Sequence, residues 1–191
     1  MKDSPKLQNP GAGVPASQLF FLKLYFGLKC RLSSQKSLAS DYQKHRKWII
    51  ETIRLLKEKE KSKQVLISPT MALEDSSRNW SIFQTLEHLT IVDTGLTGII
   101  KDLTALRTPS TIVRTKDVKP SDNPGPSAEK TFISLTSRST RQLRELPVER
   151  GGPTHAHPWF GELDAHQWLA LRTVHLSVHI RQMKKILTQL V

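Results

Sequence analysis

Three histidines have the residue type and the spacing of a metal site. His175 and His179 are four residues apart in a stretch whose apolar residues follow helical spacing, and His88 lies far upstream in another such stretch. Side chains four residues apart project from one face of a helix, so two imidazoles there can share one ion. A third imidazole from a neighbouring helix would complete a site that binds a divalent ion and leaves a position open for water or substrate. Spacing alone leaves open the alternative that the three are separate polar residues, partly exposed or hydrogen-bonded in the core.

Three capping boxes indicate where long helices begin. In a capping box the first side chain accepts a hydrogen bond from the backbone three residues later, and the later side chain accepts one in return. The three boxes pair Ser40 with Gln43, Ser81 with Gln84, and Asp164 with Gln167. The second box opens the helix that carries His88. The third opens the helix that carries His175 and His179, which we expect to run to about Leu190.

A further long helix is predicted between two loops. Ser127 is its expected cap, and Pro147 stops it after Leu146. Proline and glycine mark the flanking loops, at residues 107–126 and 151–163. Because no stretch shows the alternation of apolar and polar residues that a strand requires, we expect no strands.

The predicted fold class is all-α, a four-helix bundle with an additional N-terminal helix. Residues 1–16 are rich in Pro, Gly, Ser and Lys, so we expect this segment to be disordered. Residues 17–35 form the additional helix, which is apolar on nearly all sides and therefore needs cover from the bundle or from a partner. Residues 40–191 form the bundle domain.

The distribution of charge argues against nucleic acid as the main partner. The chain has a net charge of +12, but residues 1–65 hold 14 Lys and Arg against 5 Asp and Glu. Most of the basic surplus therefore lies outside the segments that carry the histidines. Only 6% of the residues are aromatic, and the sequence has no recognition-helix, RNA-binding or zinc-finger motif.

Two further features bear on location. Cys30 is the single cysteine, which excludes an internal disulfide and favours a cytoplasmic location. The apolar stretch at residues 19–26 contains Lys23 and is too short to span a bilayer. We therefore expect neither a secretory signal nor a transmembrane segment.

Three motifs together resemble the DinB/YfiT-like superfamily over roughly residues 40–190. They are WSIFQTLEHL at residues 80–89, HPWFGEL at residues 157–163, and the closing pair His175 and His179. The resemblance implies a four-helix bundle in which one histidine of the second bundle helix and two of the fourth bind a metal. Transferred to this chain, these ligands are His88, His175 and His179. Characterised relatives include transferases and isomerases that use low-molecular-weight thiols, and the family name does not imply DNA binding.

Several polar residues are candidates for a supporting role around the three histidines. His157 lies in the loop before the last helix, where it can line the pocket mouth. Asp93 and Glu87 can orient a ligand imidazole, and Gln182 shares a helix face with His175. The alternative for each is an ordinary solvated or loop residue. For His166, in the first turn of the last helix, we expect a solvent-facing side chain.

These observations predict a divalent-metal-dependent enzyme with a small-molecule substrate. The ion, which can be Zn, Ni, Fe or Mn, would activate water or a low-molecular-weight thiol for transfer to an electrophile. No side chain in the sequence identifies itself as a general base. The rival interpretation is a non-catalytic binding or assembly protein that retains the bundle and uses its N-terminal helix for a homodimer or a membrane-surface contact.

Overall fold

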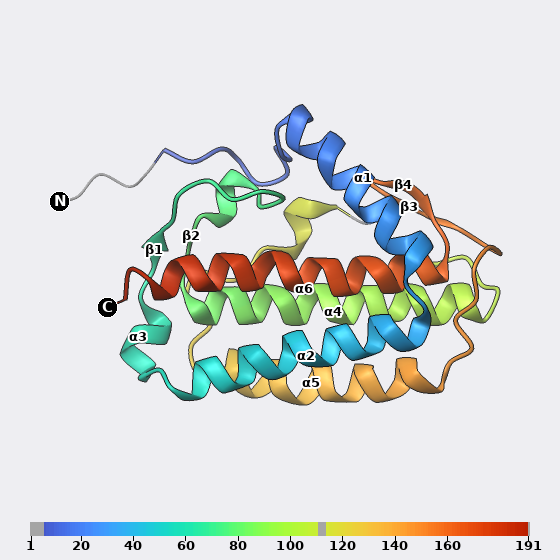
Figure 1. Cartoon of the computed structure of the whole chain (residues 1–191). Helices are drawn as coiled ribbons and strands as arrows, with labels where there is room; N and C mark the ends of the chain where they lie inside the picture. Colours follow the sequence, from blue (N-terminus) through green and yellow to red (C-terminus); the bar gives the residue numbers. More distant parts are fainter. Residues whose placement is uncertain (1–5, 111–113, 191) are drawn as a thin grey trace.

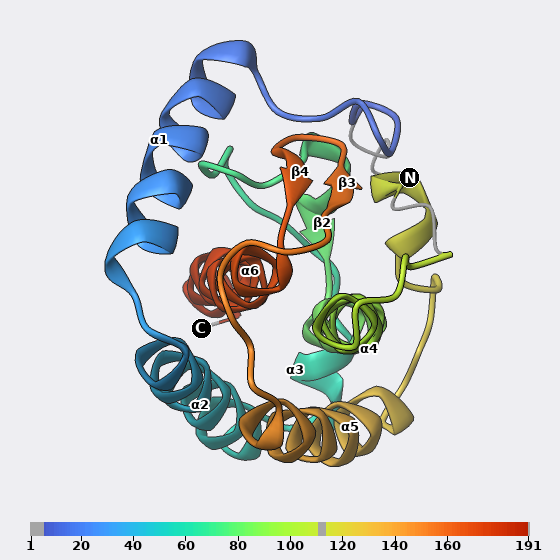
Figure 2. The same cartoon turned by 90° about the vertical axis from the view of Figure 1, so that its right-hand side faces the viewer.

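Four long helices lie side by side in the computed structural model, which describes residues 6–110 and 114–190 (Figure 1). They are α2 (Gln35–Arg54), α4 (Ile82–Thr104), α5 (Ser127–Glu145) and α6 (Ala165–Leu187). Seen end on, α4 lies between α5 and α6, and α2 contacts α5 and α6 on the other side (Figure 2). The fold is therefore all-α in class, as predicted.

Two of the three predicted capping boxes open helices. Ser81 Oγ accepts from the Gln84 backbone N–H at 3.1 Å, and Gln84 Oε1 accepts from the Ser81 N–H at 2.9 Å. Asp164 and Gln167 form the same pair of bonds at 2.8 and 2.9 Å. These caps satisfy backbone donors that have no partner within the helix, so they determine where α4 and α6 begin.

The predicted starts of the other two long helices were wrong. Helix α2 begins at Gln35, where Ser34 Oγ accepts from the Ser37 N–H, so Ser40 lies inside the helix. At α5 the capping position belongs to Pro126, and the hydroxyl of Ser127 donates to the Pro124 carbonyl. The hydroxyl therefore makes a bond within the preceding loop, and the fixed backbone angle of proline starts the helix.

Short elements join the long helices. They are α3 (Glu58–Ser62), two single 3₁₀ turns, η1 (Asp75–Ser77) and η2 (Thr115–Val118), and four strands, β1 (Val65–Leu66), β2 (Asn79–Trp80), β3 (His155–His157) and β4 (Gly161–Leu163). β1 pairs with β2, and β3 pairs with β4, both in antiparallel register. The expectation of no strands was wrong, because two or three residues are too few to show alternation. Each pair ends directly before a helix, so the pairs anchor loops at the starts of α4 and α6.

The N-terminal helix α1 (Ala16–Leu32) packs on the bundle through one face only. That face contains Leu22, Phe26 and Cys30, all buried, and the Phe26 ring lies 4.4 Å from the Phe160 ring between centroids. No helix in the described part of the chain is long and apolar enough to cross a bilayer.

The segment before α1 has no regular secondary structure but makes specific contacts. The Gln8 N–H donates to Asp75 at 2.8 Å, and the Gly11 N–H donates to Glu74 at 3.2 Å. Residues 6–15, which we expected to be disordered, are thus bonded to the loop that contains η1. The expectation for residues 1–5 lies outside the described residues.

A buried polar network joins all four long helices at mid-length. Arg172 of α6 donates to Asp93 of α4 at 2.6 Å, and their side chains are 3% and 6% exposed. Tyr42 of α2 and Ser139 of α5 donate to the two oxygens of the same carboxylate, at 2.7 and 2.5 Å. Burial raises the pKa of Tyr42 well above its ordinary value, so the phenol stays a donor. Asp93 was a candidate for orienting a ligand imidazole, and both of its oxygens instead accept hydrogen bonds within this network.

Replacing Asp93 by Asn should destabilise the fold, because it leaves the Arg172 cation buried without its counter-charge. We expect a loss of about 3–5 kcal/mol in the free energy of unfolding, measured by urea denaturation. The matched control is Asp102→Asn, since Asp102 pairs with Arg107 at the surface, with side chains 36% and 63% exposed. That change should cost at most about 1 kcal/mol. Equal losses in the two variants would contradict the assigned role of the buried pair.

Candidate metal centre

His88, His175 and His179 converge where α4 and α6 lie side by side. The His175 Nε2 atom is 3.1 Å from His88 Nε2 and 3.2 Å from His179 Nε2. One nitrogen from each ring lies within 4.8 Å of the other two. The predicted convergence is therefore confirmed. Three imidazole ligands at about 2.0–2.1 Å from one ion would have nitrogens separated by roughly this distance.

Two of the imidazoles are held from behind by carbonyl oxygens. His88 Nδ1 lies 2.6 Å from the Val118 carbonyl oxygen, at the end of η2, and His179 Nδ1 lies 2.6 Å from Gln182 Oε1. A carbonyl oxygen only accepts, so both Nδ1 atoms carry the proton. The Nε2 atoms of these rings therefore present lone pairs to the common point.

Gln182 is itself oriented by the backbone. Its Nε2 donates to the Ser77 carbonyl oxygen at 2.6 Å, which fixes which end of the amide faces His179. The side chain is fully buried, so this pair of hydrogen bonds has no competition from water. Of the predicted supporting residues, Gln182 is the one placed directly behind a ligand.

Burial keeps the three imidazoles neutral. Desolvation lowers the pKa of His88 to about 4, and the bond to Val118 offsets only part of that effect. The pKa values of His175 and His179 lie well below the ordinary value, through burial first and then through the neighbouring imidazoles. Neutral imidazole is the form that ligates a metal.

The donor set fits a divalent cation. The lone pairs of His88 and His179 face a third ring nitrogen at about 3 Å, and both of these rings are buried. Such an arrangement is repulsive between neutral acceptors unless a proton or a cation lies between them. Three imidazoles from two rigid helices leave at least one position of a four-coordinate ion open.

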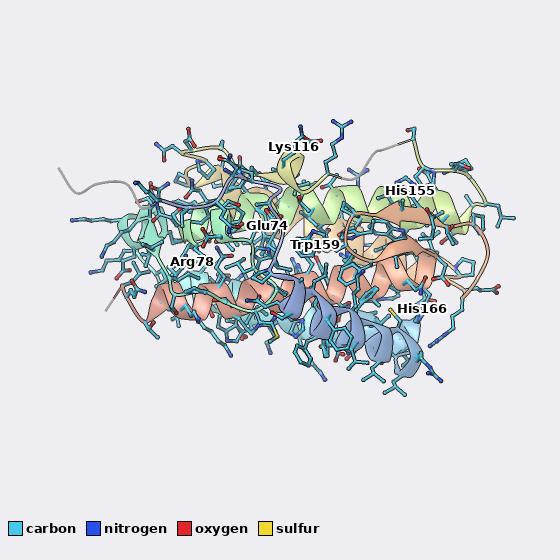
Figure 3. All side chains as sticks on the ribbon, turned by 90° about the horizontal axis from the view of Figure 1, so that it is seen from above. Glu74, Arg78, Lys116, His155, Trp159 and His166 are labelled. Carbon is cyan, nitrogen blue, oxygen red and sulfur yellow. The ribbon has the colours of Figure 1, made fainter. Side chains whose placement is uncertain are left out.

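A cavity of about 140 Å³ extends from the three histidines toward the surface. Its walls are mainly apolar. Trp80 stacks on His179 with the ring planes 6° apart and the centroids separated by 6.1 Å. Trp159 and Phe160, from the β3–β4 hairpin, cover it from another side, and Figure 3 shows Trp159 over the space between α4 and α6, near Glu74. An apolar wall raises the strength of every electrostatic interaction inside the cavity.

His157 lines this cavity, as predicted, but belongs to its wall. Burial lowers its pKa to about 4, and its Nδ1 accepts from the Trp159 N–H at 3.1 Å. The ring therefore stays neutral and uses one nitrogen to hold the hairpin. His166 was predicted to face solvent and is instead buried, with its Nε2 donating to the Ser33 carbonyl at 3.0 Å.

Three charged side chains of the cavity lining were not predicted. Glu74 precedes η1, and Arg114 and Lys119 flank η2. The Oε2 atom of Glu74 accepts from Gly11, whereas Oε1 is buried and has no hydrogen-bond partner within the described residues. No spacing rule relates these residues to the histidines, because they reach the site through irregular loops.

Glu87 holds one of those loops. Its Oε2 accepts from the Ser121 N–H at 2.6 Å and from the Ser121 hydroxyl at 2.9 Å, and within the described residues Glu87 has no hydrogen bond to an imidazole.

Comparisons of the chain with protein-family models, with curated proteins and with solved structures found no match. The chemistry of the site therefore has to be argued from its own residues.

Replacing Gln182 by Leu should weaken metal binding without removing it. The change leaves the His179 ring unfixed and the Ser77 carbonyl unpaired, while the three ligands remain. We expect the dissociation constant for Zn²⁺, measured by competition with a chromophoric chelator, to rise about 10–100-fold. The control is Gln189→Leu, an exposed glutamine beyond α6, which should leave it unchanged. An unaltered affinity in Gln182→Leu would show that the amide plays no part in the site.

Acid should destabilise the metal-free protein through His88. The pKa of this imidazole is about 4 in the folded state and about 6.5 when the chain unfolds. Between these values the unfolded chain binds the extra proton, so stability falls as the pH drops from about 6.5 to 4. The contribution of one such histidine is about 3 kcal/mol over that window. Urea unfolding of chelator-treated protein at pH 7 and at pH 4.5 should show a smaller acid loss in His88→Gln than in the parent. Identical losses would exclude His88 as a buried neutral group.

Proposed function

We propose that this chain is a divalent-metal-dependent enzyme of the DinB/YfiT-like type. Its reaction would transfer a low-molecular-weight thiol, or water, to an electrophilic small molecule. The observation that carries the proposal is the convergence of three Nε2 atoms whose rings are neutral and, in two cases, fixed from behind. The cavity that opens from this point supplies room for a reactant.

The three imidazoles would hold the ion and leave its charge uncancelled. His88, His175 and His179 are neutral donors, whereas carboxylate or thiolate ligands would offset the charge of the ion. A bound Zn, Ni, Fe or Mn ion would supply Lewis acidity, which lowers the pKa of a thiol or a water that it contacts. The surrounding Trp80 and Trp159 side chains would keep bulk water from the nucleophile.

The three charged side chains of the cavity lining support separate roles in the proposed reaction. Arg114 and Lys119 can bind an anionic group of the reactant, such as a carboxylate. Glu74 has one buried oxygen that finds no hydrogen-bond partner in the described part of the chain, and this oxygen can accept a proton released in the cavity. This carboxylate is the general-base candidate that the sequence does not identify.

The test compares metal content, stability and thiol binding in His179→Gln and in the parent. Glutamine keeps a polar side chain of similar reach but has no imidazole nitrogen. We expect the variant to stay folded, with a melting temperature close to that of the metal-free parent, and to lose tight binding of one ion per chain. In cobalt-loaded parent protein, added cysteine should produce a thiolate-to-cobalt absorption band, which the variant should lack.

The control is His155→Gln, a histidine on β3 that is not part of the three-histidine cluster. It should keep both the metal and the cobalt band. Unchanged metal content in His179→Gln would remove this histidine from the site and refute the proposal. Cobalt binding without any thiol band would leave water as the nucleophile and refute the thiol part.

A further inference from the structure

The outer side of α1 is an exposed apolar surface. Six apolar side chains of this helix are between 50% and 82% exposed, and we call them the outer stripe: Phe20, Phe21, Leu24, Tyr25, Leu28 and Leu32. At 3.6 residues per turn they span about 140° of the helix circumference. This arc lies opposite the buried face that contains Leu22 and Phe26. Contiguous apolar surfaces of this kind mark interaction sites in soluble proteins.

The outer stripe is permanently presented, because α1 is fixed along its length. The Gln18 side chain accepts from the Ala72 N–H at 3.4 Å near one end, and Lys29 pairs with Asp41 of α2 at 2.7 Å near the other. Beyond the helix, Arg150 donates to the Ser33 carbonyl at 2.9 Å. Since the inner face already packs on the bundle, α1 cannot turn to bury the stripe (Figure 2).

The charges of α1 are of one sign. The helix contains Lys23, Lys29 and Arg31 and no acidic residue. By helical period the two lysines flank the outer stripe on opposite edges, and Arg31 lies at its C-terminal end. Long basic side chains at such edges can keep their stems on apolar material and their charges in a polar, negative layer.

These charges disfavour a second copy of the chain as the partner that covers the outer stripe. A pair of α1 helices packed through their stripes would bring Lys23 and Arg31 of both copies close together, and α1 has no carboxylate to neutralise them. The net charge of +12 adds to the repulsion between copies. A partner with an apolar layer beneath a negative surface would match both the apolar and the basic side chains of α1.

We infer that α1 docks the protein on an anionic lipid bilayer. The helix lies flat, with the outer stripe about 5–10 Å into the boundary of headgroups and acyl chains. Lys23 and Arg31 contact lipid phosphates, whereas Lys29 remains with Asp41. Leu22, on the inner face of the same helix, lines the cavity beside the three histidines, so docking places the cavity behind α1, on the side of the helix away from the lipid.

The experiment is vesicle sedimentation of the full chain. Vesicles of phosphatidylcholine mixed with phosphatidylserine should bind the protein, and vesicles of phosphatidylcholine alone should bind it at least about tenfold more weakly. Leu24→Gln with Leu28→Gln should lower the partition coefficient about tenfold or more. Lys23→Gln with Arg31→Gln should lower it about tenfold, and added salt should weaken binding of the parent.

Matched controls come from exposed positions elsewhere. Leu55→Gln with Leu106→Gln removes two leucines that are 86% and 76% exposed. Arg141→Gln with Arg144→Gln removes two exposed charges of α5. Both pairs should bind vesicles as the parent does, and all variants should keep the metal content of the parent, which separates this test from that of the proposed function.

Four results would overturn the inference. They are no binding to anionic vesicles, equal binding to both vesicle types, unchanged binding in Leu24→Gln with Leu28→Gln, and a loss in the control pairs as large as in the α1 variants. A dimer mass in solution that disappears in the Leu24 and Leu28 variant, without vesicle binding by the parent, would assign the outer stripe to self-association.

Discussion

The buried pair of Asp93 and Arg172 sets the axial position of α4 against α6, and the convergence of the three histidines depends on that position. The two helices run in opposite directions (Figure 1). His88 precedes Asp93 by five residues, about 7.5 Å along α4. His175 and His179 follow Arg172 by about 4.5 and 10.5 Å along α6, so His88 falls level with the midpoint between them. A shift of α6 by one turn would move its histidines about 5.4 Å and separate the three nitrogens.

Residues close together in the sequence predicted the helices that carry the histidines, but they did not predict the pairing of Asp93 with Arg172. The capping boxes at Ser81 and Asp164 involve residues three apart, so they were visible in the sequence and correctly placed the helices that carry the histidines. The face shared by His175 and His179 follows from helical period alone. The partner of Asp93, by contrast, lies 79 residues away, and nothing local distinguishes a buried carboxylate from a solvated one.

The errors at other positions have two origins, a competing local signal and contacts distant in the sequence. Ser40 with Gln43 has the composition of a box, but Ser34 caps the helix earlier and carries the chain through that point. His166 was expected in solvent because helix starts are usually exposed, whereas it is buried and donates to the Ser33 carbonyl, 133 residues away in the sequence. Glu74, Arg114 and Lys119 reach the cavity on loops whose course depends on tertiary contacts. The first case is decided by a competing local cap, and the other cases are decided by long-range packing.

Two backbone carbonyl groups anchor the hydrogen bonds behind the histidines. The bond behind His88 comes from the backbone carbonyl of Val118, and the bond that fixes Gln182 comes from the backbone carbonyl of Ser77. A carbonyl oxygen is the same in every residue type, so side chains in η1 and η2 can change while these bonds persist. Such loops also supply Glu74, Arg114 and Lys119, which would meet the reactant. In the proposed enzyme, the range of substrates could therefore drift over evolutionary time through substitutions in these loops, while the three-histidine cluster is inherited unchanged.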